Sequence, residues 1–280
     1  MFKRLLQQAV RAALSTKVDQ RSAMRIALRY ALTNFIYIGP LLVFLLTGSA
    51  VVAEEHSTRD PSALLREADR ARGGGLSGLY WVVQVKTTGI DDVQDMTLQV
   101  KAARTSSVAE TLEPLRSKGA KMLQVDRAMW LTKPGLKKPI PISPRQRLSG
   151  QAAIGDVAAT NYSLEYAATV LRNDVVDEEP CIVLDLKAID QHATYDRVVY
   201  WVSASRGTAL RAEFFSLSGK RLKVAEFRYE NVLKHDGRSI PFISSMLITD
   251  DLTKVRTTLR YSDIRIRRIP ASEFDVGQLD

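Results

Sequence analysis

The sequence predicts a mainly β fold: an antiparallel sheet curled into a half-barrel, with a small helical lid or plug and one N-terminal helix. Many short segments between Leu79 and Ile266 alternate apolar with polar residues, which is typical of strands with one buried face. Turns rich in glycine and proline separate these segments at short intervals, as in a meandering sheet. Few stretches have helical periodicity, so the sheet is expected to curve around a small plug to bury its apolar face.

An apolar segment near the N-terminus predicts export of the rest of the chain. Ala31–Ala53 contains no charged residue and follows the basic residues Arg21, Arg25 and Arg29. An apolar run of this length partitions into a bilayer, and the basic residues hold its N-terminal side in the cytoplasm. We therefore expect residues 1–53 to be a signal peptide or an N-terminal membrane anchor, and residues 54–280 to form one domain in the periplasm.

The sequence leaves cleavage of this segment open. About 20 residues are enough to span a bilayer as an uncleaved anchor. Pro40, the polar stretch Thr47–Ser49 and the small residues Val51 and Ala53 favour a signal peptide that ends in a cleavage site.

The charge of the predicted domain is nearly balanced. The whole chain carries +9, but its first 53 residues hold seven Lys or Arg and one Asp, so 33 basic and 30 acidic residues remain. A mixed surface of this kind does not indicate nucleic-acid binding, which needs basic residues gathered on one face. One cysteine and three scattered histidines predict neither an internal disulfide nor a metal site, and we expect no cofactor.

The predicted elements begin with a helix. Asp60 and Pro61 suit its start, apolar residues follow at helical spacing from Leu64, and Gly73–Gly75 ends it. Further helical turns are expected at Glu113–Lys118, within Arg145–Tyr162 and at Pro270–Phe274. The predicted strands are Leu79–Lys86, Met96–Lys101, Ala120–Val125, Ala128–Thr132, Cys181–Leu186, Arg197–Ser203, Leu210–Leu217, Arg221–Tyr229, Phe242–Thr249 and Lys254–Ile266.

The stretch Pro139–Tyr162 interrupts the strand pattern. Its three prolines, Pro139, Pro141 and Pro144, exclude a central strand, because proline has no N–H for the ladder. Short amphipathic pieces follow them. A long insertion between strands is usually a lid or a binding loop, so we expect this segment to cover the sheet.

Several stretches carry a family resemblance, in order along the chain from about Leu64 to the C-terminus. They are Lys118–Leu123, Met129–Leu131, Pro139–Gln151, Gly155–Tyr162, Asp185–Leu186, Tyr195–Arg197, Tyr200–Val202, Arg211–Lys220 and Tyr261–Ile264. They resemble the bacterial outer-membrane lipoprotein-sorting (LolA-like) family. The resemblance implies an unclosed antiparallel β-barrel with a helical lid over an apolar cavity.

The resemblance also implies a function. It is that of a periplasmic, non-enzymatic carrier that binds lipid or lipoprotein acyl chains and works beside an inner-membrane exporter in lipoprotein sorting or lipid export. We expect a monomer that contacts a membrane surface transiently. An alternative remains open, in which the same lipid-binding fold is an interaction module that senses envelope stress.

Aromatic and aliphatic side chains are the candidate contacts of an acyl chain. The candidates are Leu79, Trp81, Val83, Val85, Trp130, Trp201 and Phe214. The first four share the face that the alternation assigns inward, whereas both faces of the Trp201 strand are apolar. These residues could equally fill an ordinary core. Arg145, Arg147 and Asp156 are candidates for fastening the lid or meeting a head group or partner, with a solvated loop as the alternative.

Other motifs favour no catalytic function. Gly73–Gly78 has the form G-x-G-x-x-G, but a helix precedes it and a strand follows, the reverse of a dinucleotide site. Asp190, His192 and Asp196 are expected in a solvated turn. The basic clusters Lys133–Lys138 and Arg265–Arg268 could meet anionic lipid, although charged turns and edges are common. We expect no enzyme.

Overall fold

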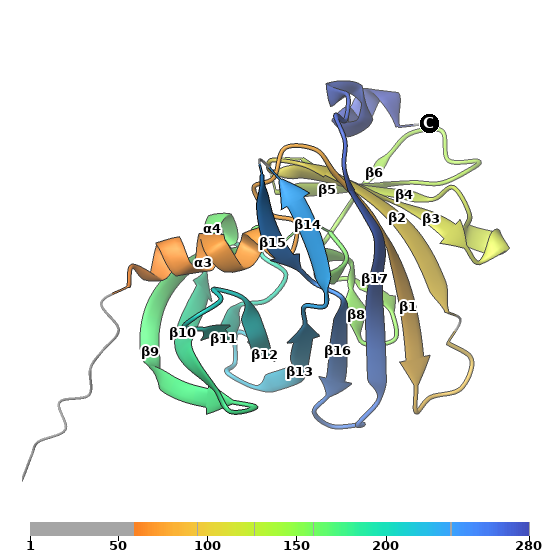
Figure 1. Cartoon of the computed structure of the whole chain (residues 1–280). Coiled ribbons are helices and arrows are strands. Elements are labelled where there is room, and N and C mark those ends of the chain that lie inside the picture. Colours follow the sequence, from red (N-terminus) through yellow and green to blue (C-terminus); the bar gives the residue numbers. More distant parts are fainter. Residues whose placement is uncertain (1–58, 94, 126, 159, 236, 280) are drawn as a thin grey trace, which may run out of the picture. The chain divides into compact units, whose positions relative to one another are not determined.

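One large antiparallel sheet makes up most of the protein (Figure 1). The computed structural model describes residues 59–93, 95–125, 127–158, 160–235 and 237–279. The predicted export segment, Ala31–Ala53, and its boundary with the domain lie outside these residues. Among the described residues, none of the helices combines the length and apolar character needed to cross a bilayer.

The sheet has thirteen strands, and neighbouring strands pair antiparallel. From one edge to the other it runs β6 (Ile140–Ile142), β5 (Ala128–Thr132), β4 (Lys121–Val125), β3 (Ser106–Glu113), β2 (Met96–Ala103), β1 (Leu79–Thr88), β17 (Arg256–Ile266), β16 (Ser245–Asp250), β13 (Arg221–Arg228), β12 (Ala209–Phe215), β11 (Arg197–Ser203), β10 (Glu179–Ala188) and β9 (Tyr166–Val176). Strands β6 and β9 are the two edges, so the barrel is not closed. The predicted mainly β, half-barrel fold is confirmed.

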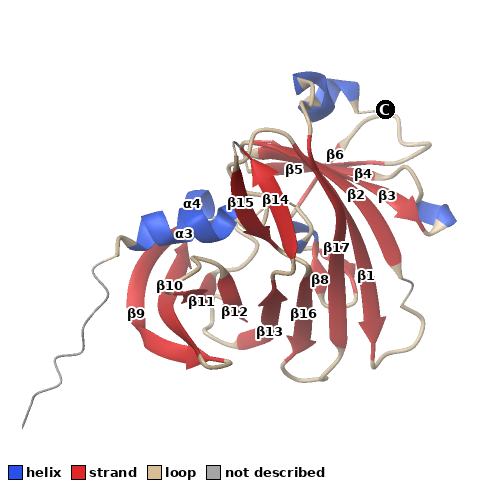
Figure 2. Ribbon diagram, in the orientation of Figure 1, coloured by secondary structure: helices blue, strands red, loops and turns tan. Residues whose placement is uncertain are grey.

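Two small hairpins and a few helical turns complete the fold (Figure 2). The hairpins are β7 (Arg147–Ser149) with β8 (Ala152–Ala153), and β14 (Asn231–His235) with β15 (Arg238–Phe242). The helical segments are α3 (Pro61–Arg70), α4 (Tyr162–Glu165), and the 3-10 turns η1 (Leu115–Ser117), η2 (Ile154–Asp156), η3 (Ala271–Phe274) and η4 (Val276–Gln278).

The predicted N-terminal helix is present as α3. The Asp60 carboxylate accepts hydrogen bonds from the backbone N–H groups of Ser62 and Ala63, which would otherwise be unpaired at the helix start. Pro61 occupies the first turn, where its missing N–H costs nothing. Leu64 and Leu65 are fully buried, so one face of α3 packs on the sheet.

The structure corrects two of the predicted elements. The expected helical region Arg145–Tyr162 contains the β7–β8 hairpin and the short turn η2, and its helix α4 begins only at Tyr162. The predicted strand Phe242–Thr249 is divided, because Phe242 ends β15 and β16 starts at Ser245. Strands β3, β6, β7, β8, β9, β14 and β15 were not predicted.

Candidate functional site

The inner face of the sheet, with the segments that cover it, forms the candidate site. Leu79, Trp81, Val83, Val85 and Phe214 all belong to one buried cluster, and each is at most 1% exposed. Their strands β1 and β12 point alternate side chains into the half-barrel, as the period of two requires. The structure therefore brings five of the seven predicted lipid contacts into one apolar interior.

Three segments cover this interior. Helix α3 contributes Leu64, Leu65 and Ala68, the segment after β8 contributes Ile154 and Val157, and the β14–β15 hairpin contributes Leu233 and Phe242. The Phe242 ring meets the Trp81 ring edge to face, with their centroids 6.1 Å apart. The interior is thus filled by the protein's own side chains in this structure.

The predicted lid, Pro139–Tyr162, runs between the two edges of the sheet. Its first part is β6, which pairs with β5, so Pro141 lies on an edge strand, where a missing N–H is tolerated. Its last residue begins α4, which leads directly into β9. The segment therefore connects the two edges of the sheet, and between them the Gln151 N–H donates to the Thr257 hydroxyl on β17, in the middle of the sheet.

Arg145 fastens this segment to the β10–β11 connection. Its Nε donates to the backbone oxygen of Ala193 at 3.0 Å, and its Nη1 lies 2.9 Å from Asp196 Oδ1. The Arg145 side chain is 37% exposed, so this contact is partly screened by solvent.

Asp156 forms a second, fully buried fastening. Its carboxylate accepts hydrogen bonds from the Tyr195 hydroxyl at 2.8 and 2.9 Å and from the Ala153 N–H at 2.8 Å. Lys223 Nζ on β13 lies 2.9 Å from the same carboxylate, and it also donates to the Gln151 oxygen at 2.6 Å. Each partner satisfies the other's buried charge, which ties the segment to the sheet.

Arg147 has a different environment. It lines a surface pocket of about 260 Å³ together with Lys220, Leu222 and Leu252. Arg145 lines the same pocket, so Arg145 and Asp156 fasten the predicted lid, and Arg145 and Arg147 border the pocket.

Helices α3 and α4 are joined by a buried carboxylate. Asp69 accepts hydrogen bonds from the backbone N–H groups of Tyr162 at 3.1 Å and Ser163 at 2.8 Å, at the start of α4. Burial raises the pKa of Asp69 to about 6, against the lowering effect of these bonds. Burial, together with the nearby Asp69 charge, raises the pKa of Glu165 on α4 to about 8.

Arg72 lies buried just beyond α3, among aromatic rings. Its guanidinium lies over the rings of Phe227 (4.6 Å) and Tyr162 (5.4 Å), and it donates to the Tyr200 hydroxyl at 3.3 Å. Its Nε has no hydrogen-bond partner among the described residues. A buried cation with an unused donor is unusual, because a buried polar group without a partner is costly.

Trp130 and Trp201 lie away from the other five predicted lipid contacts. Trp130 is half-buried beside the cluster of Val108, Leu123 and Leu279. Trp201 lies on the outer face of the sheet, because its neighbours Tyr200 and Val202 point inward. Its apolar surroundings there are Cys181, Val183 and Val199.

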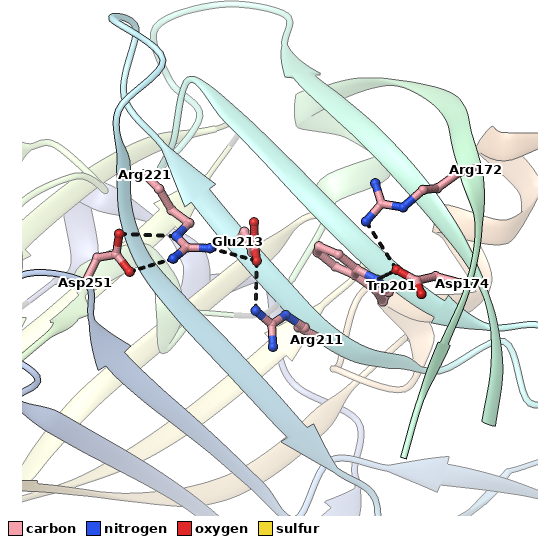
Figure 3. A network of polar contacts seen from close by, with 7 residues as sticks. All are labelled: Arg172, Asp174, Trp201, Arg211, Glu213, Arg221 and Asp251. Carbon is pink, nitrogen blue, oxygen red and sulfur yellow. Dashed lines mark hydrogen bonds and ion pairs between the residues drawn. The ribbon is translucent and has the colours of Figure 1, made fainter. Parts of the chain in front are cut away.

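Figure 3 shows the polar contacts around Trp201. The indole Nε1 donates to Asp174 at 2.9 Å, and the guanidinium groups of Arg172 and Arg211 lie about equally far from the ring. A chain of ion pairs continues along the outer face through Arg211, Glu213, Arg221 and Asp251. These contacts account for the position of Trp201 without a ligand.

Sequence reasoning missed Asp69, Arg72, Glu165, Tyr195 and Lys223. One clue was present for Lys223: it alternates with Ala225 and Phe227 along its strand, so all three side chains point to the inner face of the sheet. The others depend on which segments meet in space, which no local pattern reveals.

The glycine-rich stretch after α3 is a close-packed turn. Gly73 has a φ of +96°, and a Cβ at Gly74 would lie 1.9 Å from the Thr160 backbone oxygen. Glycine is required here for the backbone of the covering segment to approach, which agrees with the predicted helix stop. Asp190 and His192 hydrogen-bond to each other in the β10–β11 connection, and Arg127 Nη1 lies 2.8 Å from Asp190.

Comparison with known proteins places the chain in a family. A family model described as "-like: Uncharacterized protein" matches residues 103–280. The LolA superfamily protein NE2245 from Nitrosomonas europaea has a solved structure that is 31% identical, covers 78% of this chain and 98% of its own, and superposes with a TM-score of 0.69. This chain belongs to the LolA superfamily. None of the curated proteins matches it.

Two further structures share the LolA-like fold. A putative outer membrane lipoprotein-sorting protein domain from Vibrio parahaemolyticus is 19% identical, with a TM-score of 0.67 over 78% of this chain and 97% of its own. A DUF1329 family protein from Desulfovibrio piger is 18% identical, with a TM-score of 0.64 over 79% of this chain and 100% of its own. The predicted family resemblance is confirmed.

Proposed function

We propose that this protein is a non-enzymatic periplasmic carrier that holds the acyl chains of a lipid or lipoprotein inside its half-barrel, beside an inner-membrane exporter. The observation that carries the proposal is an apolar interior beneath the covering segments, which a few polar contacts fasten. We call these segments (α3, the chain between β6 and β9, and the β14–β15 hairpin) the cover. Membership of the LolA superfamily and the solved lipoprotein-sorting domain from Vibrio parahaemolyticus support it.

The physical need for such a carrier is the cost of wetting an acyl chain. Each exposed CH₂ group costs about 0.8 kcal/mol, so a long chain cannot cross an aqueous compartment unshielded. The inner face around Trp81 and Phe214 replaces water with apolar contacts. Because the protein's own side chains fill that space, the cover has to move when a chain enters.

The cover is suited to such movement. The polar contacts that hold it include the buried Asp156–Lys223 pair with β13, the partly exposed Arg145–Asp196 pair with the β10–β11 connection, and the Asp69 bonds that join α3 to α4. Opening breaks this small set of contacts and leaves the long strand pairs of the sheet intact.

Quenching by brominated acyl chains tests the proposed binding place. One variant keeps only Trp81 (W130F with W201F), and a matched variant keeps only Trp201 (W81F with W130F). A brominated fatty-acyl probe should quench Trp81 fluorescence strongly and leave Trp201 unchanged, since the two rings lie on opposite faces of the sheet.

Equal quenching of both tryptophans, or of neither, would contradict the interior as the acyl site. Native mass spectrometry of the protein purified from membranes in mild conditions adds an independent test, since a carrier should retain lipid. Fractionation of intact cells tests the proposed periplasmic location.

A further inference from the structure

Two hairpin turns lie side by side at one end of the sheet. Strands β13 and β16 are antiparallel neighbours, with Lys223 opposite Asp250. The turn 216–220 precedes β13 and the turn 251–255 follows β16, so both turns project from the same end, at the bottom of Figure 1. We call these two turns, with Leu222 and the pocket beside them, the leucine rim.

The leucine rim exposes large aliphatic side chains. Leu217 is 88% exposed, Leu252 is 72% exposed and Leu222 is 39% exposed. Leu222 and Leu252 also line one shared pocket of about 260 Å³. A single exposed leucine is ordinary, but two on adjoining turns and a third at the start of β13 indicate a surface that meets an apolar partner.

The same pocket is mainly cationic. Its charged lining consists of Arg145, Arg147, Lys220, Arg221, Lys223 and Asp250. Three of the five cations are paired with carboxylates outside the pocket lining, namely Asp196, Asp251 and Asp156. Arg147 and Lys220 remain beside Asp250.

Asp250 is itself engaged by the turn. Its carboxylate accepts hydrogen bonds from the N–H groups of Leu252 at 3.0 Å and Thr253 at 2.6 Å. These bonds and that from the Thr253 hydroxyl lower its pKa, and the nearby Arg147 charge lowers it further. The carboxylate therefore shapes the turn that presents Leu252, while the two cations face the pocket.

We propose that the leucine rim docks on the surface of a phospholipid bilayer. The leucines enter the interface between head groups and acyl chains, and the pocket holds a lipid phosphate between Arg147 and Lys220. Exposed aliphatic side chains beside cations are the combination that an anionic interface binds. Ile90, just after β1, is also exposed, but the exposed Asp91 and Asp92 beside it exclude it from the docking surface.

Site-specific fluorescence tests the proposal directly. The chain from His56 to Asp280 forms one compact unit with its own core and can be used without the N-terminal segment. Single cysteines at Leu217 or Leu252 carry an environment-sensitive dye, and Cys181 stays unlabelled because it is buried. Vesicles of phosphatidylglycerol and phosphatidylcholine should shift both dyes to the blue.

A third dye position is the matched control. Leu115 lies in the turn η1, away from the rim, and is 84% exposed. A dye at Leu115→Cys should not shift with vesicles. An equal shift at all three positions, or a shift at Leu115 alone, would overturn the proposal.

Variants separate apolar insertion from charge attraction. L217S with L252S should weaken vesicle binding at least about tenfold, because both insertions are lost, whereas L115S should leave it unchanged. R147Q with K220Q should weaken binding and lessen its dependence on salt. K137Q with K138Q removes the same charge from the turn between β5 and β6 and should have no effect. If K137Q with K138Q weakens vesicle binding, or if none of the rim variants alters it, the leucine rim is not the docking surface.

This test is independent of cargo binding. A rim variant that fails on vesicles, made together with W130F and W201F, should still show quenching of Trp81 by brominated chains in detergent. Absence of Trp81 quenching in the W130F, W201F protein with an unaltered rim, with vesicle binding intact, would reject the carrier and retain the docking surface.

Discussion

At the scale of single residues, the buried pair between Asp156 and Lys223 is the contact on which the cover depends most. Both side chains are at most 8% exposed, and Lys223 Nζ also lies over the rings of Tyr195 and Phe214. A buried charge that keeps its partner costs little, but one that loses its partner is strongly destabilising. Removal of one partner therefore shows how much the pair contributes to the stability of the fold.

We predict that Lys223→Met lowers the free energy of unfolding by about 3–5 kcal/mol, because Asp156 would stay buried without its cation. Urea denaturation monitored by circular dichroism measures this change. Arg265→Met, which removes the exposed partner of Asp263, is the control and should have little effect. If the free energy of unfolding fell by similar amounts in the two variants, burial would not be the reason for the effect of Lys223→Met.

The raised pKa of Glu165 predicts a pH dependence of stability. In the unfolded chain Glu165 has an ordinary pKa near 4.5, and burial raises it to about 8 in the folded protein. The folded state therefore holds a proton that the unfolded state has lost between these values, so stability falls as pH rises through this window. The fall is at most about 1.4 kcal/mol per pH unit.

Glu165→Gln should flatten the dependence of unfolding free energy on pH between about 5 and 8, since its amide cannot ionise. Urea denaturation at a series of pH values compares the variant with the wild type. Glu178→Gln, which changes an exposed turn residue, should leave the profile as in the wild type. Parallel profiles for E165Q and wild type would show that Glu165 does not ionise on unfolding.

At the scale of elements, the sequence identified strands with regular alternation or a continuous apolar run, and it missed strands whose pattern is interrupted or weak. Strand β9 contains a bulge at Leu171, because Val183 pairs with Arg172 and Leu184 with Val170. The extra residue exchanges the inward and outward positions, which destroys the period of two. Strand β3 begins with two serines and carries Glu110 and Glu113, so its pattern is weak.

The cover makes a prediction for hydrogen exchange. Residues 143–158 should exchange faster than Met96–Val100 in the empty protein, because their strand pairing is the short β7–β8 hairpin, whereas β2 pairs along its length with β1 and β3. Addition of lipid should slow them, since cover and acyl chain bury each other's apolar surface.

Asp156→Asn should accelerate this exchange further, whereas Arg145→Gln should do so only slightly, because Arg145 is partly exposed. Mass spectrometry after proteolysis resolves the segment. If residues 143–158 are protected as strongly as β2 without lipid, the segment is a fixed plug, and a cargo would need another entrance.

At the scale of the whole molecule, the fold could be predicted from the sequence but the fastening of the cover could not. Alternation, turns and the family resemblance indicated an open antiparallel half-barrel. The inward face of β1 followed from the alternation of apolar and polar residues along that strand. The decisive pairs join positions far apart along the chain, 67 residues for Asp156 with Lys223 and 51 for Arg145 with Asp196. Whether such distant positions meet in space depends on the curvature of the complete sheet, which no local pattern in the sequence reveals.

The chain between β6 and β9 has a mechanical consequence. It leaves one free edge of the sheet and arrives at the other, so it is a tether whose ends are the two edges themselves. When it lifts, the edges are released to spread, and the slack in roughly twenty residues limits how far they can separate. The largest cargo is then set by the length of this tether: lengthening it at the β7–β8 turn should admit bulkier acyl groups, and shortening it should exclude them.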